Sequence, residues 1–257
     1  MAKALPSLLE HLFHRRSLHR LERVAAQAQE MPLSQLRHLR QRALQMRSRI
    51  DRVLFVADER LTLPRIGSRA FHKPLHSDWG WRPSLWRGPL YPPGVAAATT
   101  KQAFGDEVTL FHDCRISELT VRQIRNTREA DVAPFGLRMD VFNFDGSFLS
   151  LVIDLPESAV RGLLRRHLVR MTAVVETERP LEVFARLNIR HGPNTEQLVR
   201  ELPLGQGEIV VEFDLAYSKL NEKRVEKAWV DLIFEQPSMN QVILRDVTFS
   251  RRPRADL

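Results

Sequence analysis

Between residues 104 and 257, ten short runs alternate apolar and polar side chains, and turn-forming residues separate them. A period of two places successive side chains on opposite faces of a β-strand. The runs are Glu107–Phe111, Leu119–Asn126, Leu137–Phe144, Ser147–Leu155, Leu168–Glu176, Leu181–Ile189, Glu196–Leu204, Glu208–Leu215, Val225–Glu235 and Val242–Arg251. Because little helix intervenes, the pattern predicts two packed antiparallel sheets.

The number of runs limits the architecture further. A jelly-roll-like antiparallel β-sandwich accommodates this many short strands best, so we expect a mainly β domain over residues 104–257. Asp145-Gly146 predicts a two-residue hairpin between the third and fourth runs. One short helix is expected, at about Glu157–Arg166.

Residues 1–60 predict a different structure, a basic helical arm. Residues 1–103 contain 18 Lys and Arg against 7 Asp and Glu, whereas the rest of the chain contains 21 against 24. A heptad seam, with apolar residues at alternating steps of three and four, marks the second helix: Leu36, Leu39, Ala43, Met46, Ile50, Val53 and Ala57. This seam predicts packing on the first helix as a helical hairpin, self-association with a second copy, or docking on another protein.

The other face of the second helix is basic. Its arginines are Arg37, Arg40, Arg42, Arg47, Arg49 and Arg52. A charge run of this kind is commonly a solvated surface. The functional alternatives are contacts with nucleic-acid phosphates or adsorption to an anionic membrane surface.

A connector is expected between the arm and the sandwich, over residues 61–103. This segment holds six prolines and four glycines, a density that excludes long helices and central strands.

The connector also holds three of the four tryptophans of the chain, Trp79, Trp81 and Trp86. Because a free linker avoids large apolar groups, we expect these rings to pack on the sandwich. The alternative is a partly exposed platform that binds a ligand, with Arg82 and Arg87 favouring an anionic one.

Motifs that carry catalysis are missing from the sequence. There is no glycine-rich phosphate loop, no cysteine pair, no HExxH and no GxSxG, so we expect no cofactor, no metal and no catalytic residue. Cys114 is expected to be a small core residue, and Trp229 to pack within the sheets or the core. His191, Asn194 and Glu196 form the best candidate polar site, on a loop that also fits ordinary turn chemistry.

Two resemblances add to this interpretation. By the stretches His76–Pro83, Ala185–Gln197 and Glu212–Tyr217, the chain resembles an uncharacterised bacterial family nearly end to end. That resemblance implies no activity. The order and length of the strands in residues 104–257 resemble those of jelly-roll carbohydrate-binding and galactose-binding-like modules, which bind through variable loops or one concave face.

These observations favour a non-catalytic binding or assembly protein. Its sandwich would recognise a glycan or a protein surface, and its basic arm would dock on an anionic or helical partner. The alternatives are a nucleic-acid-associated protein that binds through the arm, and a sugar-modifying enzyme on the concave face of the jelly roll. The sequence shows no transmembrane segment, no apolar core of a signal peptide and a single cysteine, so a cytoplasmic protein is expected.

Overall fold

The computed structural model describes residues 8–61, 74–205 and 207–254, and in the first of these ranges it describes side chains at 15–51 and 53. The chain divides into two compact units, Met1–Val56 and Ala57–Leu257. Among the described residues, no helix combines the length and the apolar character that crossing a membrane requires.

Two helices form the N-terminal unit, as the sequence predicts. α1 spans Leu8–Gln27 and α2 spans Leu33–Leu61. The heptad seam is nevertheless not buried, since Met46, Ile50 and Val53 are 49%, 52% and 67% exposed. The expectation that the first helix covers the seam is therefore wrong for these three described side chains.

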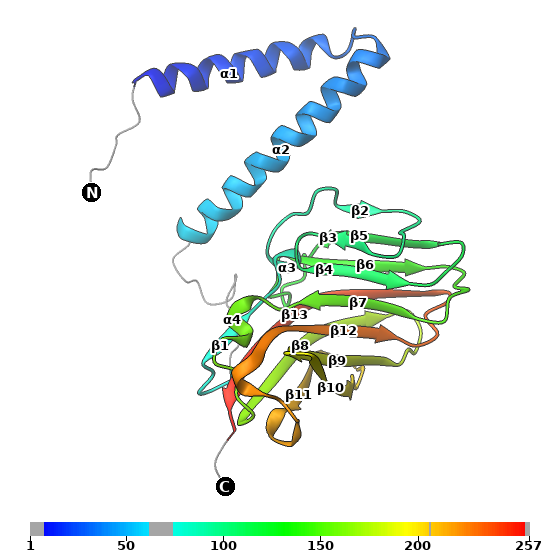
Figure 1. The fold of residues 1–257 in the computed structure, drawn as a ribbon. Coiled ribbons are helices and arrows are strands. Elements are labelled where there is room, and N and C mark those ends of the chain that lie inside the picture. The colour runs from blue at the N-terminus through cyan, green and yellow to red at the C-terminus, as the bar shows by residue number, and fades with distance from the viewer. Residues whose placement is uncertain (1–7, 62–73, 206, 255–257) are drawn as a thin grey trace. The chain divides into compact units, whose positions relative to one another are not determined.

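Two antiparallel sheets form the sandwich (Figure 1). Sheet A has the strand order β11-β8-β13-β6-β5-β2, with β1 also paired to β13, and sheet B has the order β10-β9-β12-β7-β4-β3. The strands are β1 Trp79–Trp81, β2 Gly94–Val95, β3 Gln102–Phe104, β4 Val108–His112, β5 Leu119–Arg125, β6 Phe135–Val141, β7 Leu149–Asp154, β8 His167–Thr177, β9 Val183–His191, β10 Asn194–Glu201, β11 Glu208–Asp214, β12 Val225–Phe234 and β13 Asn240–Pro253. Short helical segments are α3 Ser84–Arg87, α4 Glu157–Val160, η1 Leu215–Tyr217 and η2 Glu222–Arg224.

The predicted period of two matches the burial of the strands. In β8, Val169, Met171 and Ala173 are buried, and the residues between them face away from the core. The core lies between the two sheets, and Phe213 and Phe234 are among its largest fully buried side chains. All ten predicted strands are present, so the jelly-roll-like sandwich is confirmed.

The connector is part of the sandwich from residue 74 onward. β1 pairs with β13, and the ring of Trp81 stacks on Phe249 with ring centres 5.9 Å apart. Trp86 is fully buried, and its Nε1 donates a hydrogen bond to the carbonyl of Leu244 at 3.0 Å. These contacts hold Trp81 against the sandwich and place Trp86 inside its core. The nearby prolines are tolerated because the strands here are short and lie at a sheet edge.

A buried arginine joins three separate segments at this edge. Arg251 on β13 forms a bidentate ion pair with Asp78 at 3.0 and 3.1 Å. It also donates to the carbonyls of Ala159 and Arg161 beyond β7. The buried guanidinium group therefore has acceptors for its hydrogen bonds on two other segments. It links Asp78 of the connector to β13 and to the segment that follows β7.

Two sequence predictions are wrong in detail. Asp145-Gly146 is not a hairpin turn, because β6 belongs to sheet A and β7 to sheet B. The glycine is needed for a close approach instead, since a Cβ there would lie 2.6 Å from Oδ1 of Asp113. The helix expected at Glu157–Arg166 ends after one turn, at Val160.

Cys114 is also placed differently from the prediction. It follows β4 in a loop and is half-buried rather than a core residue. Burial raises the pKa of its thiol above the ordinary value, so the group is protonated near neutral pH.

Candidate functional site

A cavity of about 950 Å³ lies over the outer face of sheet A. Thr172 on β8 and Thr248 on β13 are direct cross-strand partners in its lining, and both face away from the core. The loop of residues 126–134 and the turn at Gly205 complete its walls. Its volume lies within the range of small-molecule and cofactor sites.

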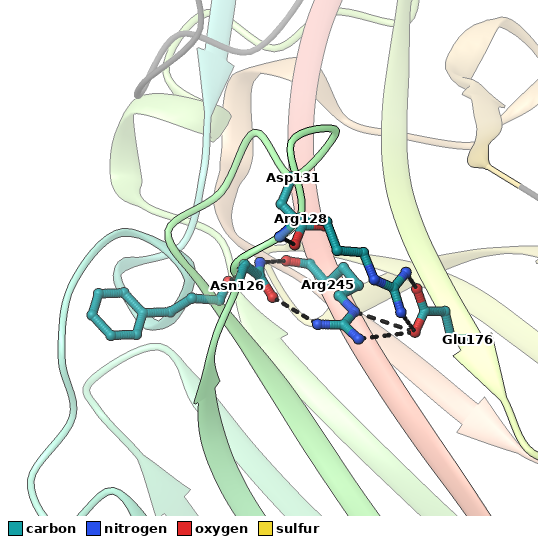
Figure 2. A network of polar contacts seen from close by, with 6 residues as sticks. Asn126, Arg128, Asp131, Glu176 and Arg245 are labelled. Atoms are coloured by element: carbon teal, nitrogen blue, oxygen red, sulfur yellow. Dashed lines mark hydrogen bonds and ion pairs between the residues drawn. The ribbon is translucent and has the colours of Figure 1, made fainter.

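Two arginines hold one carboxylate in the wall of this cavity (Figure 2). Glu176 on β8 accepts hydrogen bonds from both Arg128 and Arg245, whose guanidinium groups converge on it. The side chains of Arg128, Glu176 and Arg245 are 55%, 31% and 13% exposed. Burial alone would raise the pKa of Glu176, but the hydrogen bonds from the arginines outweigh it and hold that pKa below its ordinary value. The carboxylate is therefore ionised at neutral pH.

Asn126 anchors the loop that carries Arg128. Its Nδ2 lies 2.9 Å from the carbonyl of Ala133, 3.0 Å from that of Phe135 and 2.8 Å from that of Arg245. The loop is closed further by Asp131, which accepts a hydrogen bond from the backbone of Arg128 at 3.0 Å. The half-buried amide of Asn126 thus fixes the loop between β5 and β6 to the bulge in β13, where Arg245 is the extra residue.

The close approach of these strands requires a glycine at position 136. A Cβ on Gly136 would lie 3.0 Å from Oδ1 of Asn126 and 3.0 Å from the carbonyl oxygen of Leu244. We expect Gly136→Ala to lower the free energy of unfolding by about 1–3 kcal/mol, because both neighbours are held in place. Gly205→Ala is the control, since a Cβ there meets no atom within 4 Å. Urea unfolding measures both, and equal midpoints for the two variants would contradict the close approach.

A second ion pair forms another part of the wall. Arg82 from the connector donates to both oxygens of Asp246 on β13, at 2.9 and 2.7 Å, with the two side chains 1% and 15% exposed. Burial raises the pKa of the Asp246 carboxyl above its ordinary value, and the charge of Arg82 opposes that rise. Arg82 is therefore a buried partner that holds Asp246 in the wall, and it is not an exposed ligand contact.

The arrangement favours binding over acid–base chemistry. Both oxygens of Asp246 accept from Arg82, and both oxygens of Glu176 accept from Arg128 or Arg245. A general acid or base needs a free oxygen and a pKa near the working pH. In the described part of the chain, no three His, Cys, Asp or Glu side chains gather to hold a metal ion.

The outer face of sheet B carries a second group of polar residues, which we call the tryptophan row: Gln197, Asn188, Asp231, Arg186 and Trp229. Gln197 donates to Asn188 at 2.9 Å, and Asn188 donates to Asp231 at 3.1 Å. Arg186 donates to the same oxygen of Asp231 at 2.7 Å. The ring of Trp229 is half-exposed beside Asp231. Of the two environments predicted for Trp229, the structure therefore places it on a sheet face rather than in the core.

The candidate residues in the connector have packing roles. Trp79 donates to Oγ of Ser158 at 3.1 Å and stacks on Trp81 with ring centres 6.5 Å apart. Both rings are half-buried against the core, and Trp86 is inside it. Arg87 is half-buried in the last turn of α3. The structure thus matches the expectation that the rings pack on the sandwich.

The predicted polar loop is a tight β9–β10 hairpin that the structure does not join to the cavity lining. Gly192 has φ 64°, as the first central residue of a type II′ turn requires. His191 is 5% exposed and its Nδ1 accepts from the backbone of Asn221 at 3.4 Å, so this ring does not point to solvent as expected. Asn194 is exposed and Glu196 is half-buried.

The arginines of the arm lie where the sequence places them. Arg37, Arg40, Arg42 and Arg49 are exposed on α2, and Arg47 forms an exposed ion pair with Asp51 at 3.5 Å. Arg52 lies in α2, and its side chain is outside the described residues.

Sequence reasoning missed most of the cavity residues and the tryptophan row. The signal for the row was present: Ala228, Val230, Leu232 and Phe234 form one apolar set, so Trp229 and Asp231 belong to the opposite face. The cavity had no local signal, because Asn126 and Arg245 are 119 residues apart in the sequence.

The pattern of a family described as "Family of unknown function (DUF6478)" matches residues 1–257, the whole chain. The chain belongs to this family. No curated protein matches it. The expected resemblance to a family without known activity is thus confirmed.

Solved structures with a similar fold include carbohydrate-binding modules. A family 11 module of the cellulase Lic26A-Cel5E of Clostridium thermocellum has 9% identity and a TM-score of 0.39, covering 63% of this chain and 98% of that chain. The C-terminal family 22 module of Clostridium thermocellum Xyn10B has 9% identity and a TM-score of 0.37, covering 62% and 93%. The enzymatically active domain of bacteriophage CBA120 tailspike protein 4 has 8% identity and a TM-score of 0.39, and the match spans 56% of this chain and 19% of that chain.

Proposed function

We propose that this protein is a non-catalytic binding protein whose sandwich takes a neutral glycan in the cavity over sheet A. The observation that carries the proposal is the mixture of fixed donors and acceptors in the cavity wall. Arg128 and Arg245 supply donors, and Glu176, Thr172 and Thr248 supply acceptors or hydroxyl groups. A sugar hydroxyl both donates and accepts, so it matches a wall with both kinds of group.

The charges of the cavity support a neutral ligand. Its lining holds three arginines, Arg128, Arg179 and Arg245, and five carboxylates, Asp131, Glu176, Glu178, Glu208 and Asp246. Since Arg82 also pairs with Asp246, these five carboxylates face four arginines, and the net negative charge disfavours a phosphate or another anion at close range. A nucleic acid, if bound, would therefore contact the basic arm rather than the sandwich.

The basic arm is a separate part of the proposal. Exposed arginines on α2, among them Arg40 and Arg49, support docking on an anionic or helical partner. Nucleic acid and an anionic membrane surface are the other anionic partners that such a surface would attract.

The tryptophan row is the other surface that a glycan could use. Its half-exposed Trp229 offers a ring face, and Asp231 and Asn188 are already fixed by hydrogen bonds. Nζ of Lys227 lies 5.6 Å from the centre of the same ring, so a ligand would have to share or displace this contact. The cavity is open without such a displacement, which favours it.

The test is a glycan-binding experiment with a variant that blocks the cavity, a matched control variant, and Trp229→Ala as the variant of the tryptophan row. Thr172→Trp fills the cavity from an outward-facing position of β8, and we expect at least about a tenfold loss of affinity, because the added ring excludes the ligand. Leu75→Trp adds the same ring at a position that is 85% exposed and outside the cavity lining, and it should bind like the wild type. An oligosaccharide panel selects the ligand, and titration calorimetry measures the affinity.

Each outcome decides between the surfaces. Loss of binding in Thr172→Trp alone supports the cavity. Loss in Trp229→Ala alone moves the site to the tryptophan row and overturns the cavity proposal. No binding to any neutral oligosaccharide by the wild-type protein overturns glycan recognition itself.

A further inference from the structure

The heptad seam of α2 is bordered by arginines on both sides. With Leu36, Ala43 and Ile50 at the a positions, Leu39 and Met46 take the d positions. The e and g positions border such a seam and face the flanks of a partner helix. In these two heptads every e and g position after Leu39 is arginine: Arg40, Arg42, Arg47 and Arg49.

The seam and its border are both accessible. Met46 is 49% exposed and Ile50 is 52% exposed. All four bordering arginines are exposed, and the ion pair of Arg47 with Asp51 is one turn along the same helix. A row of half-exposed apolar side chains costs free energy in water, and a partner helix would cover it.

The charges exclude a second copy of this helix as a favourable partner. In a parallel pair, g positions of one helix meet e positions of the other, and in an antiparallel pair, e meets e and g meets g. Because all four bordering residues are arginine, either orientation places like charges opposite one another. Like charges at these positions select against a pairing even where the apolar seam fits.

An anionic bilayer also fits the charge but fits the seam less well. A helix that lies in a membrane surface presents a broad apolar face. Between Leu36 and Ile50 the seam is narrow, because arginines at positions 40, 42, 47 and 49 stand directly beside it. A narrow seam with charged borders is the geometry of helix-to-helix packing.

We propose that α2 docks on an acidic helix, with apolar residues at its own a and d positions and Glu or Asp at its e and g positions. This inference rests on the proposed role of the arm and names the chemistry of its partner. The apolar seam provides the contact area between the two helices. The arginines favour a partner helix with acidic flanks and determine how that helix is oriented on α2.

A charge-swap experiment with the full chain tests the pairing. The probe is a peptide of roughly four heptads with Leu at a and d and Glu at e and g, and its counterpart carries Lys at e and g. Fluorescence anisotropy should show that the wild-type protein binds the Glu peptide at least about tenfold more tightly than the Lys peptide. Reversing the four arginines to glutamate should invert this preference. Reversing Arg15, Arg16, Arg20 and Arg23 of α1 makes the same change of net charge and should leave it intact.

Two further measurements distinguish an acidic helix from the other candidate partners of the seam, which are a second copy of α2 and an anionic membrane. Sedimentation of wild type mixed with the four-glutamate variant should show heterodimers, while each protein alone stays monomeric. Ile50→Asp should abolish peptide binding without affecting glycan binding by the sandwich, so failure of one proposal is distinguishable from failure of the other. Self-association of the wild type through the seam overturns the proposal. So does binding to vesicles rich in phosphatidylserine with no binding to the Glu peptide.

Discussion

Trp86→Ala should lower the free energy of unfolding by about 3–5 kcal/mol, the usual cost of truncating a buried aromatic side chain. Trp86 is 0% exposed, and its Nε1 donates to the carbonyl of Leu244 at 3.0 Å. The substitution leaves a cavity beneath α3 and removes the partner of a carbonyl beside the bulge of β13. Urea unfolding followed by circular dichroism measures the loss.

Two companion variants separate the causes. Trp86→Phe keeps most of the ring but removes the N–H donor, so it should cost only about 1–3 kcal/mol through the unsatisfied carbonyl. Leu75→Ala changes a connector residue that is 85% exposed and should stay within about 0.5 kcal/mol of the wild type. If Trp86→Ala unfolds at the same urea concentration as Leu75→Ala, the connector does not belong to the cooperative unit of the sandwich.

The strands were predictable because each is long enough to show its own period. β8 and β12 contain eleven and ten residues, and apolar side chains mark one face of each. β2 and β3 contain two and three residues, too few to show a period. All of their residues except Phe104 fall in the predicted connector, because the prolines and glycines around them conceal the pairing with β5 and β4.

The error at Asp145-Gly146 shows what a turn signal leaves open. The dipeptide does mark a reversal of the chain, but β6 and β7 lie in different sheets. Asp113 accepts hydrogen bonds from the backbone and the hydroxyl of Ser147, at 2.7 and 2.6 Å. These hydrogen bonds hold the loop that connects β6 in sheet A to β7 in sheet B. Because Asp113 lies far from this loop in the sequence, the residues of the loop alone do not predict its path.

The candidate site was not predictable for a related reason. Arg245 is the extra residue of the bulge in β13, and its guanidinium group reaches Glu176 on β8; the bulge changes the face on which Asp246 and the following side chains lie. From the sequence alone, strict alternation along β13 predicts that Asp246 lies on the same face as Leu244, toward the core. The bulge instead places Asp246 in the lining of the cavity. Arg82 was interpreted as a ligand contact because its partner, Asp246, is 164 residues away in the sequence.

Arg82→Met should be as destabilising as the loss of Trp86, because it leaves the Asp246 carboxylate buried without its counter-charge. Breaking a buried ion pair at one end typically costs about 3–5 kcal/mol. Arg161→Met is the matched control, since Arg161 and Glu157 form an ion pair with both side chains largely exposed, and its loss should change little. Replacing both partners, as in Arg82→Met with Asp246→Leu, should recover most of the stability, because no charge then remains buried.

The pH dependence of this variant gives the sharper test. Burial already raises the pKa of Asp246 in the folded protein, and without Arg82 only the hydrogen bond from the backbone of Val247 opposes that rise. A carboxyl whose pKa is higher folded than unfolded stabilises the fold when it is protonated, and this contribution is lost as the pH rises through the folded-state pKa. The deficit of Arg82→Met relative to the wild type should therefore be larger at neutral pH than at an acidic pH below the raised pKa of Asp246, where the carboxyl is protonated. A deficit that is the same at both pH values would mean that Arg82 stabilises the wall by packing alone, and that the carboxylate of Asp246 is reached by water.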